Sequence, residues 1–80
     1  MKPWIWADWC ESIEAGIAQE NKVDNVQVVG SFDFVFAHIV RGKQSTFVGW
    51  SATLYDLDSE ADRNLFKTHM LEAVGFVLRK

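Results

Sequence analysis

Three side chains of this sequence could support nucleophilic or metal chemistry: Cys10, His38 and His69. A thiol in the first turn of a helix can have a lowered pKa, and a histidine could serve as its base. However, the three residues lie far apart in the chain, and no pair has the short spacing typical of zinc ligands. No glycine-rich nucleophile motif accompanies Cys10. We therefore predict that Cys10 is a small buried apolar residue, and we expect neither enzymatic activity nor a metal or cofactor.

An alternating acidic run from Asp56 to Asp62 has the spacing with which a calcium loop begins. Such a loop needs a glycine at the position that Ala61 occupies, and a bidentate glutamate where Lys67 stands. The run is therefore better explained as the capping segment of a helix, with acidic residues in the first turn where the helix dipole favours them.

The stretch KPWIWADWC places Trp4, Trp6 and Trp9 within six residues. Trp9 begins an apolar stripe with Ile13 and Ile17, which predicts a helix over residues 7–21 capped by Asp8. Trp4 and Trp6 precede that cap. They could fold onto the first turns as a hydrophobic staple, form a short edge strand, or remain partly exposed as anchors for a partner, because tryptophan is enriched at the energetic centres of interfaces.

The rest of the chain predicts three strands and a second helix. The strands are expected over residues 26–29, 32–40 and 45–55, with residues 41–44 as a hairpin connection around Gly42. The second helix follows a cap at Asp58 or Ser59. Alternation places Phe32, Phe34, Phe36, His38 and Val40 on one face of the second strand, and we assign the phenylalanines to the core together with Trp50 of the third.

These elements predict an α+β fold with the order α-β-β-β-α, a three-stranded antiparallel sheet and both helices on one face, forming a single domain over residues 1–80. This order resembles that of the double-stranded-RNA-binding domain, which has a similar length. Those domains place lysines at the start of the second helix, whereas here that segment reads SEADRN and carries Glu60 and Asp62. The resemblance therefore concerns the fold alone.

Charge and cysteine content narrow the classes of function. The net charge is −3, and the basic residues are scattered, whereas nucleic-acid binding favours a concentrated basic face. One cysteine excludes an intrachain disulfide, and no stretch approaches the roughly 18 apolar residues of a membrane span. We expect an intracellular, cytoplasmic protein without a membrane segment.

The leading functional hypothesis is a non-enzymatic protein-binding module, of the kind that phages and mobile elements use as small inhibitors or adaptors against host enzymes or defence complexes. Its alternatives are a structural homo-oligomer such as a homodimer, and a nucleic-acid-binding domain that would use Lys22, Arg41 and Lys43. A sheet face with Val35, Ala37, Ile39 and Phe47 is a further candidate surface, because helices cover only one face. The residues we predict to bind a partner are Trp4, Trp6, Leu71, Val74, Phe76 and Leu78.

Overall fold

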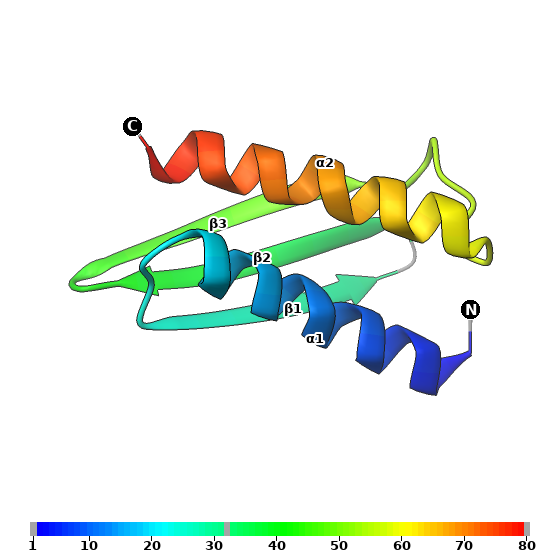
Figure 1. Cartoon of the computed structure of the whole chain (residues 1–80), viewed down its shortest axis with the longest axis horizontal. Helices are drawn as coiled ribbons and strands as arrows, with labels where there is room; N and C mark the ends of the chain where they lie inside the picture. Colours follow the sequence, from blue (N-terminus) through cyan, green and yellow to red (C-terminus); the bar gives the residue numbers. More distant parts are fainter. Residues whose placement is uncertain (1, 32, 80) are drawn as a thin grey trace.

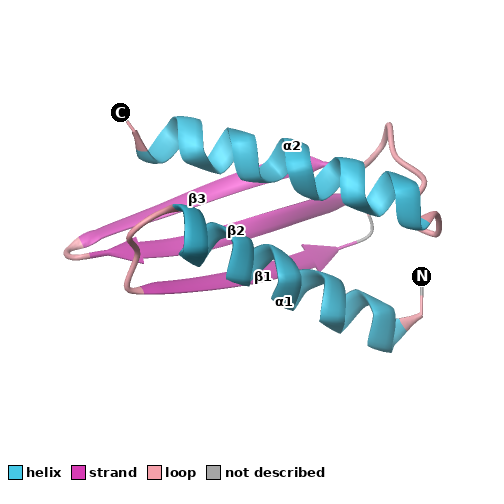
Figure 2. Ribbon diagram, in the orientation of Figure 1, coloured by secondary structure: helices cyan, strands magenta, loops and turns pink. Residues whose placement is uncertain are grey.

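The computed structural model describes residues 2–31 and 33–79. In chain order its elements are α1 (Pro3–Glu20), β1 (Asn25–Ser31), β2 (Phe34–Arg41), β3 (Gln44–Ser51) and α2 (Glu60–Leu78). The strands form one antiparallel sheet in the order β1-β2-β3, and both helices lie on the same face of it, α1 over β1 and α2 over β3 (Figure 1, Figure 2). The predicted fold class is confirmed.

A two-residue turn sets the register of the hairpin formed by β2 and β3. Arg41 pairs with Gln44, and Gly42 between them has a positive φ of 61°, which glycine adopts without the steric cost that a Cβ would add. The Gly42 amide also donates a hydrogen bond to the Asp24 carboxylate, 2.7 Å away. This contact ties the hairpin to the loop that precedes β1.

The first helix starts earlier than the sequence predicted. It begins at Pro3 and not at Ala7, and its N-cap is Lys2 and not Asp8. Proline is well suited to the first helical position, and tertiary contacts support the additional turn. The Trp6 ring lies against Gly30 of β1 and packs on Trp9, with 5.4 Å between the ring centroids. Trp4 and Trp6 are therefore helical residues, which excludes both the edge strand and a position ahead of the cap. The start of α2 agrees with the prediction, since Ser59 is its N-cap.

The core lies between the helices and the sheet. Trp9, Ile13 and Ile17 point into it from α1 at a spacing of four residues, as predicted. The second helix contributes residues at the same spacing, and the sheet supplies smaller side chains. These α2 and sheet residues are Phe66, Met70, Val74, Leu78, Val28, Val35, Ala37, Ile39, Val48 and Ala52.

The predicted orientation of the second strand is wrong. Val35, Ala37 and Ile39 face the helices and are buried, whereas Phe34 and Phe36 point to the uncovered side of the sheet. The helices already supply bulky side chains, so the small residues of β2 fit beneath them while the phenylalanines do not. Phe32, which we also assigned to the core, lies outside the described residues. Trp50 is on the helix-covered face, half-buried, as assigned.

The two helices run in the same direction, so both begin at one end of the molecule (Figure 1). Near that end, the Trp9 indole donates a hydrogen bond to the Arg63 carbonyl, at 3.2 Å. Further along, the Leu71 side chain packs close to Gly16. We call this end, with the β1–β2 turn and the loop of residues 52–59, the helix-start end. The opposite end, with the hairpin of residues 41–44, is the helix-finish end.

Neither α1 nor α2 combines the length and the apolar character that crossing a lipid bilayer requires, over the residues that the structure describes.

The contact between Trp6 and Gly30 leads to a test of the fold. A Cβ on Gly30 would lie 1.9 Å from the Trp6 ring, so Gly30→Ala must displace that ring. We expect the free energy of unfolding to fall by about 1–3 kcal/mol. Gly75→Ala is the matched control, because its Cβ would meet only ordinary contacts and alanine favours helix by up to about 1 kcal/mol. Urea unfolding should give opposite signs for the two variants. Equal effects would contradict the packing of Trp6 on β1.

Candidate functional site

The side of the sheet that faces away from the helices carries a group of large apolar side chains. Phe47 is 71% exposed, Val29 52%, Phe36 41% and Phe34 37%. They come from all three strands, since Val29 pairs with Phe36 across β1 and β2, and Phe47 pairs with His38 across β2 and β3. We call this surface the open face. Its described members are Asn25, Gln27, Val29, Phe34, Phe36, His38, Val40, Ser45, Phe47, Gly49 and Ser51.

Two stacked ring pairs make up the centre of the open face. The rings of Phe34 and Phe36 stack with centroids 5.0 Å apart, and the imidazole of His38 stacks on Phe47 at 4.4 Å with only 5° between the planes. The phenylalanine pair reaches across to β3 and covers Gly49, where a Cβ would lie 2.8 Å from Phe34 and 3.0 Å from Phe36. Gly49 therefore gives these rings room to lie flat on the neighbouring strand.

The open face is apolar at its centre and polar at its margin. His38 is hydrogen-bonded through Nε2 to the hydroxyl of Ser45, and Gln27 and Asn25 line the β1 side. None of the described residues of this face is Asp, Glu, Lys or Arg. An exposed apolar group of this kind, ringed by neutral polar residues, is typical of a surface that binds another macromolecule.

The residues predicted from the sequence to bind a partner do not form one surface. Trp4 and Phe76 are exposed, at 63% and 62%, but they lie near opposite ends of the helical layer. The Lys2 ammonium sits 5.1 Å from the centroid of the Trp4 ring. Trp6 and Leu71 are half-buried against Gly30 and Gly16, whereas Val74 and Leu78 face the core and are unavailable to a partner.

Of the residues that the sequence assigned to a possible open sheet face, only Phe47 is there. The other three are core residues, and the open face instead holds Phe34, Phe36 and Val29. The missing signal was the pairing register. A two-residue turn at Gly42 and Lys43 places Val35 beside Trp50 and Ala37 beside Val48. Once Trp50 is assigned to the core, its partners on β2 must share that face.

Cys10 is buried, as predicted, on the side of α1 that faces the core. Burial, with a smaller contribution from the Glu14 carboxylate, raises the pKa of the thiol to about 11. Both histidines bond elsewhere: His38 lies on the open face, and Nδ1 of His69 is hydrogen-bonded to the Tyr55 hydroxyl at 2.6 Å. The arrangement does not supply an activated thiolate.

The hydrogen bond between Tyr55 and His69 is one of several contacts that fix a loop to the rest of the domain. The Tyr55 ring packs edge-on against Phe66, with 5.0 Å between centroids, and its hydroxyl also lies 3.5 Å from the Trp50 indole nitrogen. These contacts hold the loop of residues 52–59 against α2 and β3.

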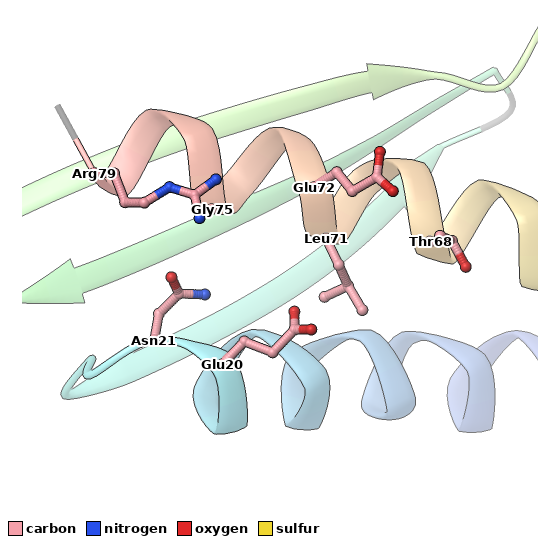
Figure 3. A pocket seen from close by; sticks show the side chains of 7 residues that line it. All are labelled: Glu20, Asn21, Thr68, Leu71, Glu72, Gly75 and Arg79. Atoms are coloured by element: carbon pink, nitrogen blue, oxygen red, sulfur yellow. The ribbon is translucent and has the colours of Figure 1, made fainter.

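A groove of about 500 Å³ lies on the helical side, where the last turn of α1 meets the second half of α2 (Figure 3). Leu71 points from α2 toward α1 in this groove, and the carboxylate of Glu20 is directed toward α2. The Arg79 guanidinium lies over Gly75. Its remaining lining residues are Asn21, Thr68 and Glu72. The groove is lined by charged side chains of opposite sign and by few apolar ones, and these do not form a catalytic arrangement.

No set of three or more His, Cys, Asp or Glu side chains is close enough to hold a metal ion within residues 2–31 and 33–79. Comparison of the chain with protein-family models, with curated proteins and with solved structures found no match.

The basic residues considered for nucleic acid gather at the helix-finish end. Lys22 and Lys43 are exposed there, while the Arg41 guanidinium donates a hydrogen bond to the Leu78 carbonyl at 3.1 Å. That bond anchors the end of α2 on β2. None of these three side chains belongs to the open face.

The state of Cys10 can be measured directly. With a pKa of about 11, about one thiol in a thousand is ionised at pH 8, and the side chain is only 7% exposed. We expect negligible labelling by a disulfide reagent at pH 8 in native buffer and complete labelling in denaturant. Because the folded-state pKa is raised above its ordinary value of 9.0, the contribution of this thiol to the free energy of unfolding should be constant below pH 9 and fall as the pH rises toward 11. Rapid labelling of the native protein would contradict this environment.

Proposed function

We propose that this chain is a non-enzymatic protein-binding module and that it acts through the open face. The observation that carries the proposal is the group of aromatic side chains on the uncovered side of the sheet, with Phe47 71% exposed at its centre. A small domain has few large apolar residues to spare for solvent, and burial of each phenylalanine against a partner is worth roughly 1.5–3 kcal/mol.

Several features support binding to protein over other uses. The rings are held in fixed positions by stacking and by the flat surface of the strands, so little side-chain entropy is lost when a partner covers them. The centre is aromatic and free of charged residues, which matches the composition of buried interface cores. The neutral polar margin can exchange hydrogen bonds with a partner without burying an unpaired charge. A module of this type suits an inhibitor or adaptor.

Nucleic acid is the alternative that a specific observation favours, because exposed rings on a sheet can stack on bases. However, such surfaces combine stacking with a basic groove that follows the phosphates. The three cations considered for this role, Lys22, Arg41 and Lys43, lie at the helix-finish end and are not members of the open face. We therefore favour a protein partner. Salt-dependent binding of a single-stranded oligonucleotide that is lost in Phe47→Ser would reverse this preference.

The proposal predicts which exposed aromatic residue matters. Phe47→Ser should abolish capture of a partner from a lysate of the native host on the immobilised chain, with at least a tenfold loss in affinity once the partner is purified. Trp4→Ala is the matched control, since Trp4 is similarly exposed but lies on α1, on the opposite side of the sheet from Phe47. It should leave capture unchanged.

Folding of both variants can be checked in the same preparation. Both side chains are mostly exposed, so each substitution should change the free energy of unfolding by less than about 1 kcal/mol. If Trp4→Ala abolished capture and Phe47→Ser did not, the binding surface would lie on the helices and the proposal would fail.

A further inference from the structure

We infer that the partner of the open face is a second copy of this chain, packed face to face with its strands reversed. This inference rests on the proposed function, because it names the occupant of the same surface. It begins from the distribution of charge along the molecule, whose longest dimension is 36 Å.

Acidic residues gather at the helix-start end. Two basic residues, Lys2 and Arg63, also lie there. The acidic residues of this end are Asp8, Asp33, Asp56, Asp58, Glu60 and Asp62. The helix-finish end carries the acidic residues Glu20, Asp24 and Glu72, which four basic residues outnumber. The basic residues are Lys22, Arg41, Lys43 and Arg79. The chain is therefore negative at one end and positive at the other.

The helices explain part of this separation. Glu60 and Asp62 lie in the first turn of α2, where they offset the partial positive charge of that helix terminus. That local compensation does not account for Lys43 and Asp33, which lie in the turns of the sheet and not in a helix. These two exposed residues stand in the turns just beyond the opposite ends of β2.

Two symmetric arrangements bring the open face onto a copy of itself. With the twofold axis parallel to the strands, like ends meet, so Lys43 approaches Lys43 of the second copy and the acidic ends also repel. With the axis perpendicular to the strands, each positive end lies over a negative end. The end of each copy that carries Lys43 then lies near the end of the other copy that carries Asp33, so the facing ends attract each other. The charge distribution selects the second arrangement.

The open face itself is compatible with self-association. A twofold interface brings a surface onto itself, so any charged residue near the axis would meet its own kind. The absence of charge among the described residues of this face removes that penalty. Since a phenylalanine exposes on the order of 200 Å², the exposed parts of Phe34, Phe36, Phe47 and Val29 provide about 400 Å² of apolar surface.

That area sets the expected strength. With its polar margin, the face approaches but does not exceed the roughly 800 Å² per partner of a standard interface. We expect a reversible dimer with a Kd between about 10 µM and 1 mM, whose population depends on concentration.

Sedimentation equilibrium of the full chain from 5 µM to 2 mM at low ionic strength tests the inference. The wild type should change from monomer to dimer across this range, and Trp4→Ala should behave identically. Phe47→Ser should weaken the dimer at least tenfold. Gly49→Val, which displaces the Phe34 and Phe36 rings without touching the core, should weaken it as well.

Charge reversal tests the orientation. Lys43→Asp and Asp33→Lys should each weaken the dimer roughly fivefold to tenfold, because each substitution is present in both copies and opposes the attraction between the facing ends. The double variant should return to within about threefold of the wild type. Loss of restoration in the double variant would overturn the reversed arrangement.

The two proposals fail in different ways. A monomer at every concentration, or a dimer that Phe47→Ser leaves intact, overturns self-association; the latter would point to pairing through the edges of β1 or β3. If the chain stays monomeric but captures a different protein in a Phe47-dependent manner, the binding module stands and only its partner changes. If neither a dimer nor Phe47-dependent capture occurs, both proposals fail.

Discussion

The packing of both helices against one side of a three-stranded sheet is the constraint on which the rest of this structure depends. Large side chains of both helices fill the space above the sheet, among them Trp9 of α1 and Phe66 of α2. The strands contribute smaller side chains to the same core, such as Ala37 and Val48. Because strand residues alternate between faces, the residues that face the helices also determine which residues lie on the uncovered face of the sheet. With no third layer among the described elements, every residue that alternates away from the helices meets solvent, whatever its size.

That consequence links the fold to its candidate function. Phe34, Phe36 and Phe47 directly precede Val35, Ala37 and Val48 along their strands, so they point to the other side of the sheet. No described element covers them there. Stacking within the pairs Phe34–Phe36 and His38–Phe47 shields part of their surface, and the bare backbone at Gly49 lets two rings lie down on β3. The residual exposure is still large for a chain of this size, and its most economical explanation is a partner that completes the layer.

Electrostatics act on a longer scale than these contacts. The parallel course of the helices aligns their dipoles, and Glu60 and Asp62 in the first turn of α2 stabilise the start of that helix. Acidic residues are also concentrated at the helix-start end, and basic residues at the helix-finish end. The same distribution gives the whole molecule a positive and a negative end. The turns that join the strands place the exposed residues Lys43 and Asp33 at these two ends. This separation of charge favours one orientation in any association through the sheet. The preference is strongest at low salt, where charges interact over a longer range.

The sequence by itself determined the order of the elements, the hairpin at Gly42, the start of α2 after Asp58 or Ser59, the apolar stripe of α1 and the burial of Cys10, because local periodicity and turn-forming residues control each of these. It also contained the two-residue turn at Gly42 and Lys43, which relates the faces of β2 to those of β3. What only the tertiary structure decided was which side of β2 is covered and where α1 begins. Both faces of β2 are apolar, so alternation shows which residues share a face but not which face the helices choose, and packing volume makes that choice. The start of α1 depends on Trp6 meeting Gly30, two residues brought together only when the helix lies on the sheet.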